Sequence, residues 1–335
     1  MEGTETMKKI LLIATGGTIA FQITENGLSP AVTSAELLTF VPELHSLCQI
    51  DTVQLFNLDS TDICQTHWLR IAATVRDRYE AYDGFVITHG TDTMAYTAAA
   101  LSYLIQNSGK PVVLTGSQQS IYSRDTDACR NLLCAFRYAV SDVAWGVHVV
   151  FDGKVILGTR ARKVRTKSFN AFASIDYPET AVFSDMRLIP FLPVPQLPPV
   201  RFYDKMENSV FVLHLIPGMD AGIFTYLKLH YRALLIESFG VGGVPSYGGG
   251  AFLEAVRDWT SCGKLMVFTT QVPHEGSDLG VYAVGSEAKR TEGVVETGNM
   301  TPEAAVTKLM WAMAQTGDRR EAERLFLTPV CCDIF

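Results

Sequence analysis

Small hydroxyl and carboxylate side chains follow several apolar runs of this sequence. The run "ILLI" leads into "ATGGTIA", and two further runs end in "NLDSTD" and "THGTDTM". An alcohol becomes a good nucleophile when a neighbouring group takes its proton, and "THGTD" sets a threonine beside a carboxylate. The pattern indicates a small polar substrate and chemistry at a hydroxyl group. The candidate residues are Thr15, Thr18, Ser60, Thr61, Asp62, Thr91 and Asp92.

The glycine pair of "ATGGTIA" has two interpretations. A nucleotide-binding loop requires GxxxxGK[ST], or GxGxxG at the start of a helix, and neither is present. The GxSxG elbow of α/β-hydrolases is absent as well. Gly16 and Gly17 allow a tight turn and a close approach of the backbone to a ligand, so that Thr18 is presented to it. A purely structural turn explains the glycines equally well.

A proton acceptor for a hydroxyl group can come from the basic segment "GTRARKVRTKS", residues 158–168. A lysine acts as a base when its neighbours lower its pKa. The simpler interpretation of this segment is a solvated loop or an anion-binding patch. His89 abuts the candidate residues and is interpreted mainly as a structural group. The seven histidines show no i, i+3 or i, i+4 pairing, so no metal site is predicted.

The candidate residues lie where apolar runs alternate with helical periodicity. Helices are expected along the apolar face from Trp68 to Tyr82, over 93–109 with a stop at Gly109, and around 128–140. This alternation predicts parallel strands joined by crossover helices. Because ligands bind beyond the carboxyl ends of such strands, the polar loops are expected at one edge of the sheet. Strands are expected at 53–58, 84–90 and 111–116.

Three short signals predict local structure. Asp152-Gly153 between two β-rich runs predicts a hairpin. Thr33 and Glu36 form a potential capping box at the start of a short helix. Thr301, followed by a proline, predicts the start of a helix that ends at Gly317.

The fold class predicted is α/β, with two α/β domains that have mainly parallel sheets. The length of 335 residues suggests two domains, and the proline-rich "IPFLPVPQLPPV" is interpreted as a linker. Three buried strands are expected after it, in "VFVLHL", "ALLIESFG" and "KLMVFTTQ". We expect a larger N-terminal catalytic domain at 1–190, the linker at 191–207 and a smaller C-terminal domain at 208–335.

Composition argues against several classes of partner. The net charge of −7 disfavours binding to nucleic acid or to an anionic membrane. No apolar run approaches the roughly 18 residues of a spanning helix, and the apolar part of "MKKILLIA" is short for a signal peptide. Seven cysteines without CxxC or zinc-like spacing fit reduced thiols. We therefore expect a cytoplasmic protein.

Two motifs, "ATGGTIA" and "DGFVITHGTDTM", resemble the signatures of the bacterial-type L-asparaginases almost letter for letter. The resemblance extends along nearly the whole chain. "MAYTAAALSYL", "GKPVVLTGSQ" and "ESFGVGG" are similar to the intracellular type I branch rather than the periplasmic type II branch. The resemblance implies an amidohydrolase that converts L-asparagine to L-aspartate and ammonia without a cofactor. It also implies a homodimer or a tetramer of dimers.

The resemblance assigns roles to individual residues. The nucleophile that would form an acyl-enzyme intermediate corresponds to Thr18. Thr91 and Asp92 correspond to the family's threonine–aspartate pair, and the family lysine corresponds to Lys163. Whether Thr18 or Thr91 attacks first stays open. The expected substrate-binding residues are Ser60, Thr61, Asp92, Gly17 and Gly90.

Three positions depart from the family pattern. Leu28 stands where many members have a tyrosine that helps to orient the nucleophile. Gly243 replaces a common asparagine, and Glu237 replaces an arginine of the allosteric asparagine site of some type I enzymes. Allostery of that type is therefore not predicted.

The segment from Phe21 to Val32 shows little periodicity and contains Asn26-Gly27. It can be a surface hairpin, or a lid that excludes water before the reaction. Its position directly after the first motif favours the lid.

Three other functions stay open. The ammonia-producing subunit of archaeal transfer-RNA amidotransferases shares these motifs, although it carries an additional N-terminal domain. A glutaminase or mixed activity is plausible, because one methylene is worth only about 1–3 kcal/mol of discrimination. A ligand sensor or scaffold on a degenerate asparaginase fold is supported by the replaced tyrosine and asparagine.

Overall fold

An eight-stranded sheet forms the centre of the first unit of the chain, Met1–Asp204. The computed structural model describes residues 7–24, 27–30 and 33–335. The five neighbours β8, β7, β5, β1 and β4 are parallel, whereas β9, β12 and β13 continue the sheet antiparallel. In spatial order the strands are β13 (Arg187–Pro190), β12 (Ala181–Ser184), β9 (Lys154–Leu157), β8 (Val147–Phe151), β7 (Val112–Thr115), β5 (Gly84–Thr88), β1 (Lys9–Gly16) and β4 (Gln49–Leu58).

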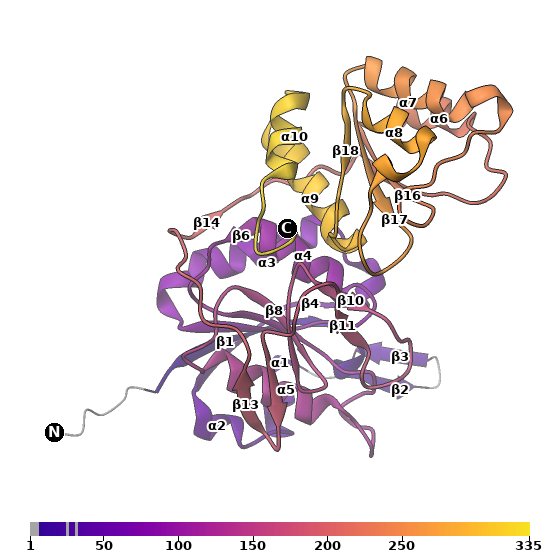
Figure 1. Cartoon of the computed structure of the whole chain (residues 1–335). Helices are drawn as coiled ribbons and strands as arrows, with labels where there is room; N and C mark the ends of the chain where they lie inside the picture. Colours follow the sequence, from indigo (N-terminus) through magenta and orange to yellow (C-terminus); the bar gives the residue numbers. More distant parts are fainter. Residues whose placement is uncertain (1–6, 25–26, 31–32) are drawn as a thin grey trace. The chain divides into compact units, whose positions relative to one another are not determined.

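Helices cover both faces of this sheet (Figure 1). One core cluster joins Ile10 and Leu12 of β1 to residues of α1, α2 and α5, while α3 and α4 lie on the opposite side. Strand β5 is buried along its whole length, as expected for a parallel strand covered on both faces. The helices are α1 (Ser34–Thr39), α2 (Leu44–Leu47), α3 (Gln65–Arg78), α4 (Met94–Leu104) and α5 (Ala128–Ala139), with short 3-10 turns η1 (Thr18–Ala20), η2 (Ser60–Asp62) and η3 (Tyr79–Ala81).

Among the described residues of this unit, three two-stranded sheets lie outside the large sheet. They are β2 (Phe21–Thr24) with β3 (Gly27–Pro30), β10 (Ala161–Lys163) with β11 (Phe172–Ser174), and β6 (Ile105–Gln106) with β14 (Arg201–Phe202). The first pair is the backbone of a hairpin within the segment for which a lid was predicted. Residues 25, 26, 31 and 32 of that segment lie outside the described residues.

The helix predicted over 93–109 is shorter than expected. Helix α4 ends at Leu104, because the next two residues form β6 and pair with β14. Asn107 then adopts a left-handed φ of 59°. This pairing joins segments about a hundred residues apart along the chain, so local periodicity could not predict it. The proline-rich stretch before β14 carries no helix or strand from Phe191 to Val200.

The local signals are confirmed. Asp152 and Gly153 turn with φ of 50° and 75° between β8 and β9. Thr33 and Glu36 form both hydrogen bonds of a capping box at α1. The Thr301 hydroxyl accepts from the Ala304 amide and caps helix α9 (Pro302–Gln315), whose first residue is a proline.

The second unit, Lys205–Phe335, is built on a four-stranded parallel sheet. Three strands were predicted, and the short fourth strand at its edge was not. Helices α6 to α8 cover one face, where Trp259 and Phe268 lie in the core, and α9 lies on the other face (Figure 1). The elements are β15 (Val210–His214), β16 (Ala233–Ser238), β17 (Leu265–Thr270), β18 (Val294–Glu296), α6 (Ile223–His230), α7 (Ala251–Ser261), α8 (Ala283–Lys289), α9 (Pro302–Gln315), α10 (Arg319–Leu327), and the turns η4 (Gly248–Gly250) and η5 (Leu279–Val281).

Two units with mainly parallel sheets confirm the predicted α/β class. Cys48 and Cys134 are buried thiols, whereas Cys64 and Cys262 are exposed thiols. In the described part of the chain, no helix has both the length and the apolar character needed to cross a membrane.

Acid is expected to destabilise the first unit through two buried histidines. Burial lowers the pKa of His89 to about 4 and that of His148 to about 3. Both rings stay neutral in the folded protein, while the unfolded chain takes up protons below about pH 6.5. The free energy of unfolding therefore falls as the pH drops from 6.5 towards 4, by about 2 kcal/mol per histidine at pH 5.

Urea unfolding at pH 7 and pH 5 measures this effect. In His148→Gln the decrease in the free energy of unfolding from pH 7 to pH 5 should be smaller by about 2 kcal/mol, because one titrating group has been removed. An unchanged loss would show that the histidine is not the source.

Candidate active site

Four polar loops meet at one edge of the first sheet. They follow β4, β1, β5 and β7, which are parallel neighbours, so their carboxyl ends lie side by side. Three of these loops were predicted to converge. The loop after β7 was not included in the prediction, although "TGSQQS" shows the same polar composition at a strand end.

The loops after β1 and β5 touch through their glycines. Gly17 has a φ of 85°, and its amide donates to the Leu58 carbonyl at 2.9 Å. A β-carbon built on Gly17 would lie 2.3 Å from the Gly90 nitrogen, and one built on Gly90 would lie 2.6 Å from the Ser60 hydroxyl oxygen. Only glycine permits this contact. It brings the segments that begin with Thr18 and Thr91 together.

The substitution Gly17→Ala should therefore displace the loop that carries Thr18. The added methyl group meets backbone atoms rather than a movable side chain, and the left-handed φ adds strain. A displacement of about 1 Å in a catalytic site costs about 100-fold in turnover. Gly109→Ala is the matched control, since nothing lies within 4 Å of its β-carbon position. Equal turnover of the two variants would refute the structural role of Gly17.

Lys163 forms hydrogen bonds with both Thr91 and Asp92. Its Nζ donates to Thr91 Oγ1 at 2.7 Å and to Asp92 Oδ1 at 2.5 Å. The lysine side chain is 16% exposed, whereas the aspartate side chain is 62% exposed, so solvent reaches the pair from the side of Asp92. Lys163 reaches this position from the end of β10, which β11 holds by antiparallel pairing. Three residues that are far apart in sequence thus form one hydrogen-bonded group.

Gln118, which the sequence prediction missed, contacts the same hydroxyl. Thr91 Oγ1 donates to Gln118 Oε1 at 3.1 Å, and Gln118 Nε2 donates to the Ser168 carbonyl at 3.0 Å. The Gln118 backbone amide is held by the Asp127 carboxylate. The polar loop after β7 was the signal that could have pointed to it.

Thr18 is half-buried and opens η1 directly after β1. The turn is closed by the Ala20 amide, which donates to the Gly17 carbonyl at 3.0 Å. Ile19, next to it, is fully buried and accepts through its carbonyl from the Ile121 amide at 3.2 Å. The hydroxyl-bearing residue therefore stands on a well-anchored backbone at the edge where Lys163 and Thr91 meet.

The two predicted binding residues of the loop after β4 differ in environment. Ser60 is buried beneath Gly90, and its carbonyl accepts from the Thr93 hydroxyl at 2.7 Å. Thr61 is exposed, and its hydroxyl donates to Asp59 at 2.8 Å within the same turn. Only Ser60 lies against the loop that carries Thr91.

Two expectations about the site need correction. Thr15 is buried and its hydroxyl donates to the Thr88 carbonyl at 2.7 Å, so it ties β1 to β5 instead of joining the other candidates. The basic segment is not simply solvated, because Arg160 is fully buried while residues 164–168 are exposed.

His89 is a structural group, as expected. Its Nδ1 lies 2.7 Å from the Gly90 carbonyl oxygen and its Nε2 lies 2.9 Å from Thr97 Oγ1, which also accepts from Trp68. The buried ring therefore connects the turn after β5 to helix α4 through these two contacts.

The three departures from the family pattern lie in different places. Leu28 belongs to β3, where its backbone pairs with Ile23. In the second unit, Gly243 pairs with Phe239 in an isolated bridge. Glu237 Oε2 lies 2.7 Å from Nδ1 of His214, so a carboxylate rather than a guanidinium group occupies that strand end.

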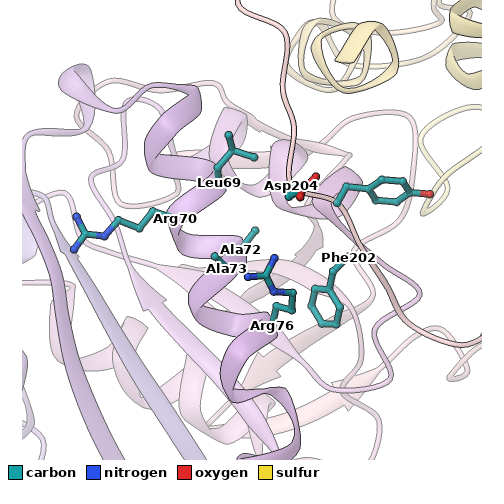
Figure 2. Close-up of a pocket in the computed structure, with 8 residues that line it drawn as sticks. Leu69, Arg70, Ala72, Ala73, Arg76, Phe202 and Asp204 are labelled. Atoms are coloured by element: carbon teal, nitrogen blue, oxygen red, sulfur yellow. The ribbon is translucent and has the colours of Figure 1, made fainter. Parts of the chain in front are cut away.

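A pocket of about 400 Å³ lies apart from these loops (Figure 2). Helix α3 lines it with Arg70 and Arg76, and the β14 segment lines it with Phe202 and Asp204. It contains none of the predicted site residues. Within residues 7–24, 27–30 and 33–335, no group of three or more His, Cys, Asp or Glu side chains could hold a metal ion.

Comparisons with known proteins agree with this architecture. The family model "Asparaginase, N-terminal" matches residues 9–191, and "Glutaminase/Asparaginase C-terminal domain" matches residues 209–326. An L-asparaginase of Thermococcus kodakarensis is 39% identical over 95% of this chain and 96% of its own length. A glutamyl-tRNA(Gln) amidotransferase subunit of Pyrococcus furiosus is 38% identical over 98% of this chain and 77% of its own length.

Solved structures give the same result. The thermostable L-asparaginase from Thermococcus kodakarensis superposes with a TM-score of 0.92 at 36% identity, covering 98% of this chain and 99% of that one. L-asparaginase I from Vibrio cholerae superposes with a TM-score of 0.87 at 28% identity, over 98% and 100%. Together with the loops at the sheet edge, these matches define a hydrolase of the asparaginase fold. The chain belongs to the bacterial-type L-asparaginase family, on its type I branch, as its motifs predicted.

Proposed function

We propose that this protein is an L-asparaginase that hydrolyses the side-chain amide of L-asparagine to give L-aspartate and ammonia. The observation that carries the proposal is the contact of Lys163 Nζ with both Thr91 Oγ1 and Asp92 Oδ1, at 2.7 and 2.5 Å. This group lies beside the loop that bears Thr18. The names of the relatives and of the solved structures support the substrate.

In the proposed reaction Thr18 is the nucleophile. Its hydroxyl oxygen bonds to the amide carbon and its proton leaves to a neighbouring base. The carbon–nitrogen bond breaks, and the nitrogen leaves as ammonia after taking up a proton. Water then attacks the β-aspartyl ester, which releases aspartate and restores the Thr18 hydroxyl. Water is the only co-substrate that this balance requires.

Thr91, Asp92 and Lys163 manage the protons in this proposal. The Asp92 carboxylate keeps the Lys163 side chain charged or oriented beside the Thr91 hydroxyl. Thr91, which accepts from the lysine, can then pass a proton from Lys163 towards the departing nitrogen.

Loop backbone and hydroxyl groups would bind the substrate. Buried Ser60 would receive the α-carboxylate, with Thr61 at the exposed side of the same loop. Asp92, which is more than half exposed, can pair with the α-ammonium group. Gly17 and Gly90 let backbone amides near Thr91 approach the oxyanion that forms during attack.

A second candidate is an ammonia-producing amidotransferase subunit. It is favoured by the Pyrococcus relative, whose identity is almost as high as that of the asparaginase. A homodimer or a tetramer of dimers and a cytoplasmic location are further parts of the proposal, and they rest on the type I resemblance.

Steady-state ammonia release by the pure protein, measured against asparagine and glutamine, separates these functions. An asparaginase hydrolyses asparagine without a partner protein and prefers asparagine to glutamine. An amidotransferase subunit would need its partner for turnover, and a sensor would bind without releasing ammonia. Sigmoidal kinetics would reveal cooperativity in the same data.

A further inference from the structure

Gln118 and Lys163 both contact the Thr91 hydroxyl. The hydrogens that they carry determine the direction in which the hydroxyl donates its own hydrogen. A lysine ammonium has three donors and no acceptor. Lys163 lies 2.5 Å from Asp92 Oδ1, the geometry of a charged pair, so Thr91 accepts from it at 2.7 Å. The only hydrogen of the hydroxyl must then point elsewhere.

The orientation of Gln118 supplies that direction. The Ser168 carbonyl can only accept, so the group that faces it at 3.0 Å is the amide NH₂ of Gln118. This leaves Gln118 Oε1 facing Thr91 Oγ1 at 3.1 Å. Two oxygens at this distance share one hydrogen, and Thr91 is the only one of the two that carries one.

The Gln118 backbone is itself anchored. The Asp127 carboxylate, 9% exposed, accepts from the Gln118 amide at 3.0 and 3.1 Å and from the Gln119 amide at 3.1 Å. Asn131, one turn along α5, donates to the same carboxylate at 3.1 Å. Gln118 is thus held through its backbone by Asp127, the residue that precedes α5, and through its side-chain amide by the Ser168 carbonyl.

We propose that Gln118 is a positioning residue that turns the Thr91 proton away from Lys163. Thr91 is then an acceptor towards the lysine and does not hand it a proton, which leaves Thr18 as the residue that attacks first. This inference rests on the proposed function for its catalytic meaning, but the direction of the proton is a property of the resting protein.

Neutron diffraction of deuterium-exchanged crystals tests the direction without any turnover. The expected result is a deuterium on Thr91 Oγ1 that points to Gln118 Oε1, with deuterium on Lys163 Nζ pointing to Thr91. A deuterium on Thr91 that points to Lys163 would overturn the proposal. If the wild-type protein released no ammonia from asparagine, the proposed function would fail while this result would still decide the inference.

Kinetics of Gln118→Met test the consequence. Methionine keeps the length of the side chain and removes the acceptor, so kcat should fall by about 10- to 100-fold while KM changes much less. Gln119→Met is the matched control, because its side chain is exposed. Its kcat should stay near that of wild type. Wild-type kcat in a folded Gln118→Met protein, or an equal loss in both variants, would contradict the positioning role.

Discussion

Lys163→Met is expected to lower asparagine turnover by about 100- to 10,000-fold, the range for loss of a proton-transfer group. Methionine fills much of the same space but cannot donate to Thr91 or pair with Asp92. The thermal midpoint should change little, because the lost ion pair includes an aspartate side chain that is 62% exposed. Ammonia release and thermal unfolding of the same preparation measure both quantities.

Lys167→Met provides the control for this experiment. Lys167 lies on the same basic segment and is exposed, so its loss changes the net charge equally without touching the site. Its turnover should match that of wild type. A comparable loss in both variants would indicate that the segment acts through its overall charge and not through one lysine.

Asp333→Ala is expected to cost about 3–5 kcal/mol of stability, the penalty for breaking a buried ion pair. Lys308 Nζ and Asp333 Oδ2 are 2.7 Å apart, and both side chains are fully buried. Burial lowers the pKa of Lys308, and Asp333 opposes that shift. Without the carboxylate, the lysine keeps the Thr328 carbonyl as an acceptor but has no counter-charge, so it either stays charged and unpaired or gives up its proton. Denaturant unfolding, followed by circular dichroism, measures the loss.

An exposed pair and a double replacement distinguish this effect from a general loss of charge. Lys8 and Asp142 are also 2.7 Å apart, but the Asp142 side chain is 94% exposed, so Asp142→Ala should cost less than about 1 kcal/mol. The double variant Lys308→Met with Asp333→Leu should be more stable than Asp333→Ala, because no unpaired charge remains buried. A loss in Asp333→Ala no larger than that in Asp142→Ala would contradict the stabilising role of the buried pair.

Much of the fold was accessible from the sequence because its signals are local. Strand β5 is an uninterrupted apolar run, and the Asp152-Gly153 turn needs residues that tolerate positive φ. The predicted end of α4 was wrong because β14, far along the chain, pairs with Ile105. Strand β18 was missed because three residues give too little periodicity.

Some residues of the candidate site could be predicted from sequence motifs, whereas others depend on contacts between distant segments. Thr91, Asp92 and Lys163 were named from motifs, and the structure brings these three together. Thr15 was misplaced because a strand-end threonine can turn into the sheet as readily as out of it. Gln118 was missed because its role depends on a contact with Ser168 that no spacing encodes.

In the proposed mechanism, Thr18 acts as the nucleophile beside the group formed by Thr91, Asp92 and Lys163. The most direct test is ammonia release from asparagine at saturating concentration by Thr18→Ala. We expect a rate at least about 1,000-fold below wild type, with asparagine still bound. Turnover of Thr18→Ala at the wild-type rate would contradict the claim.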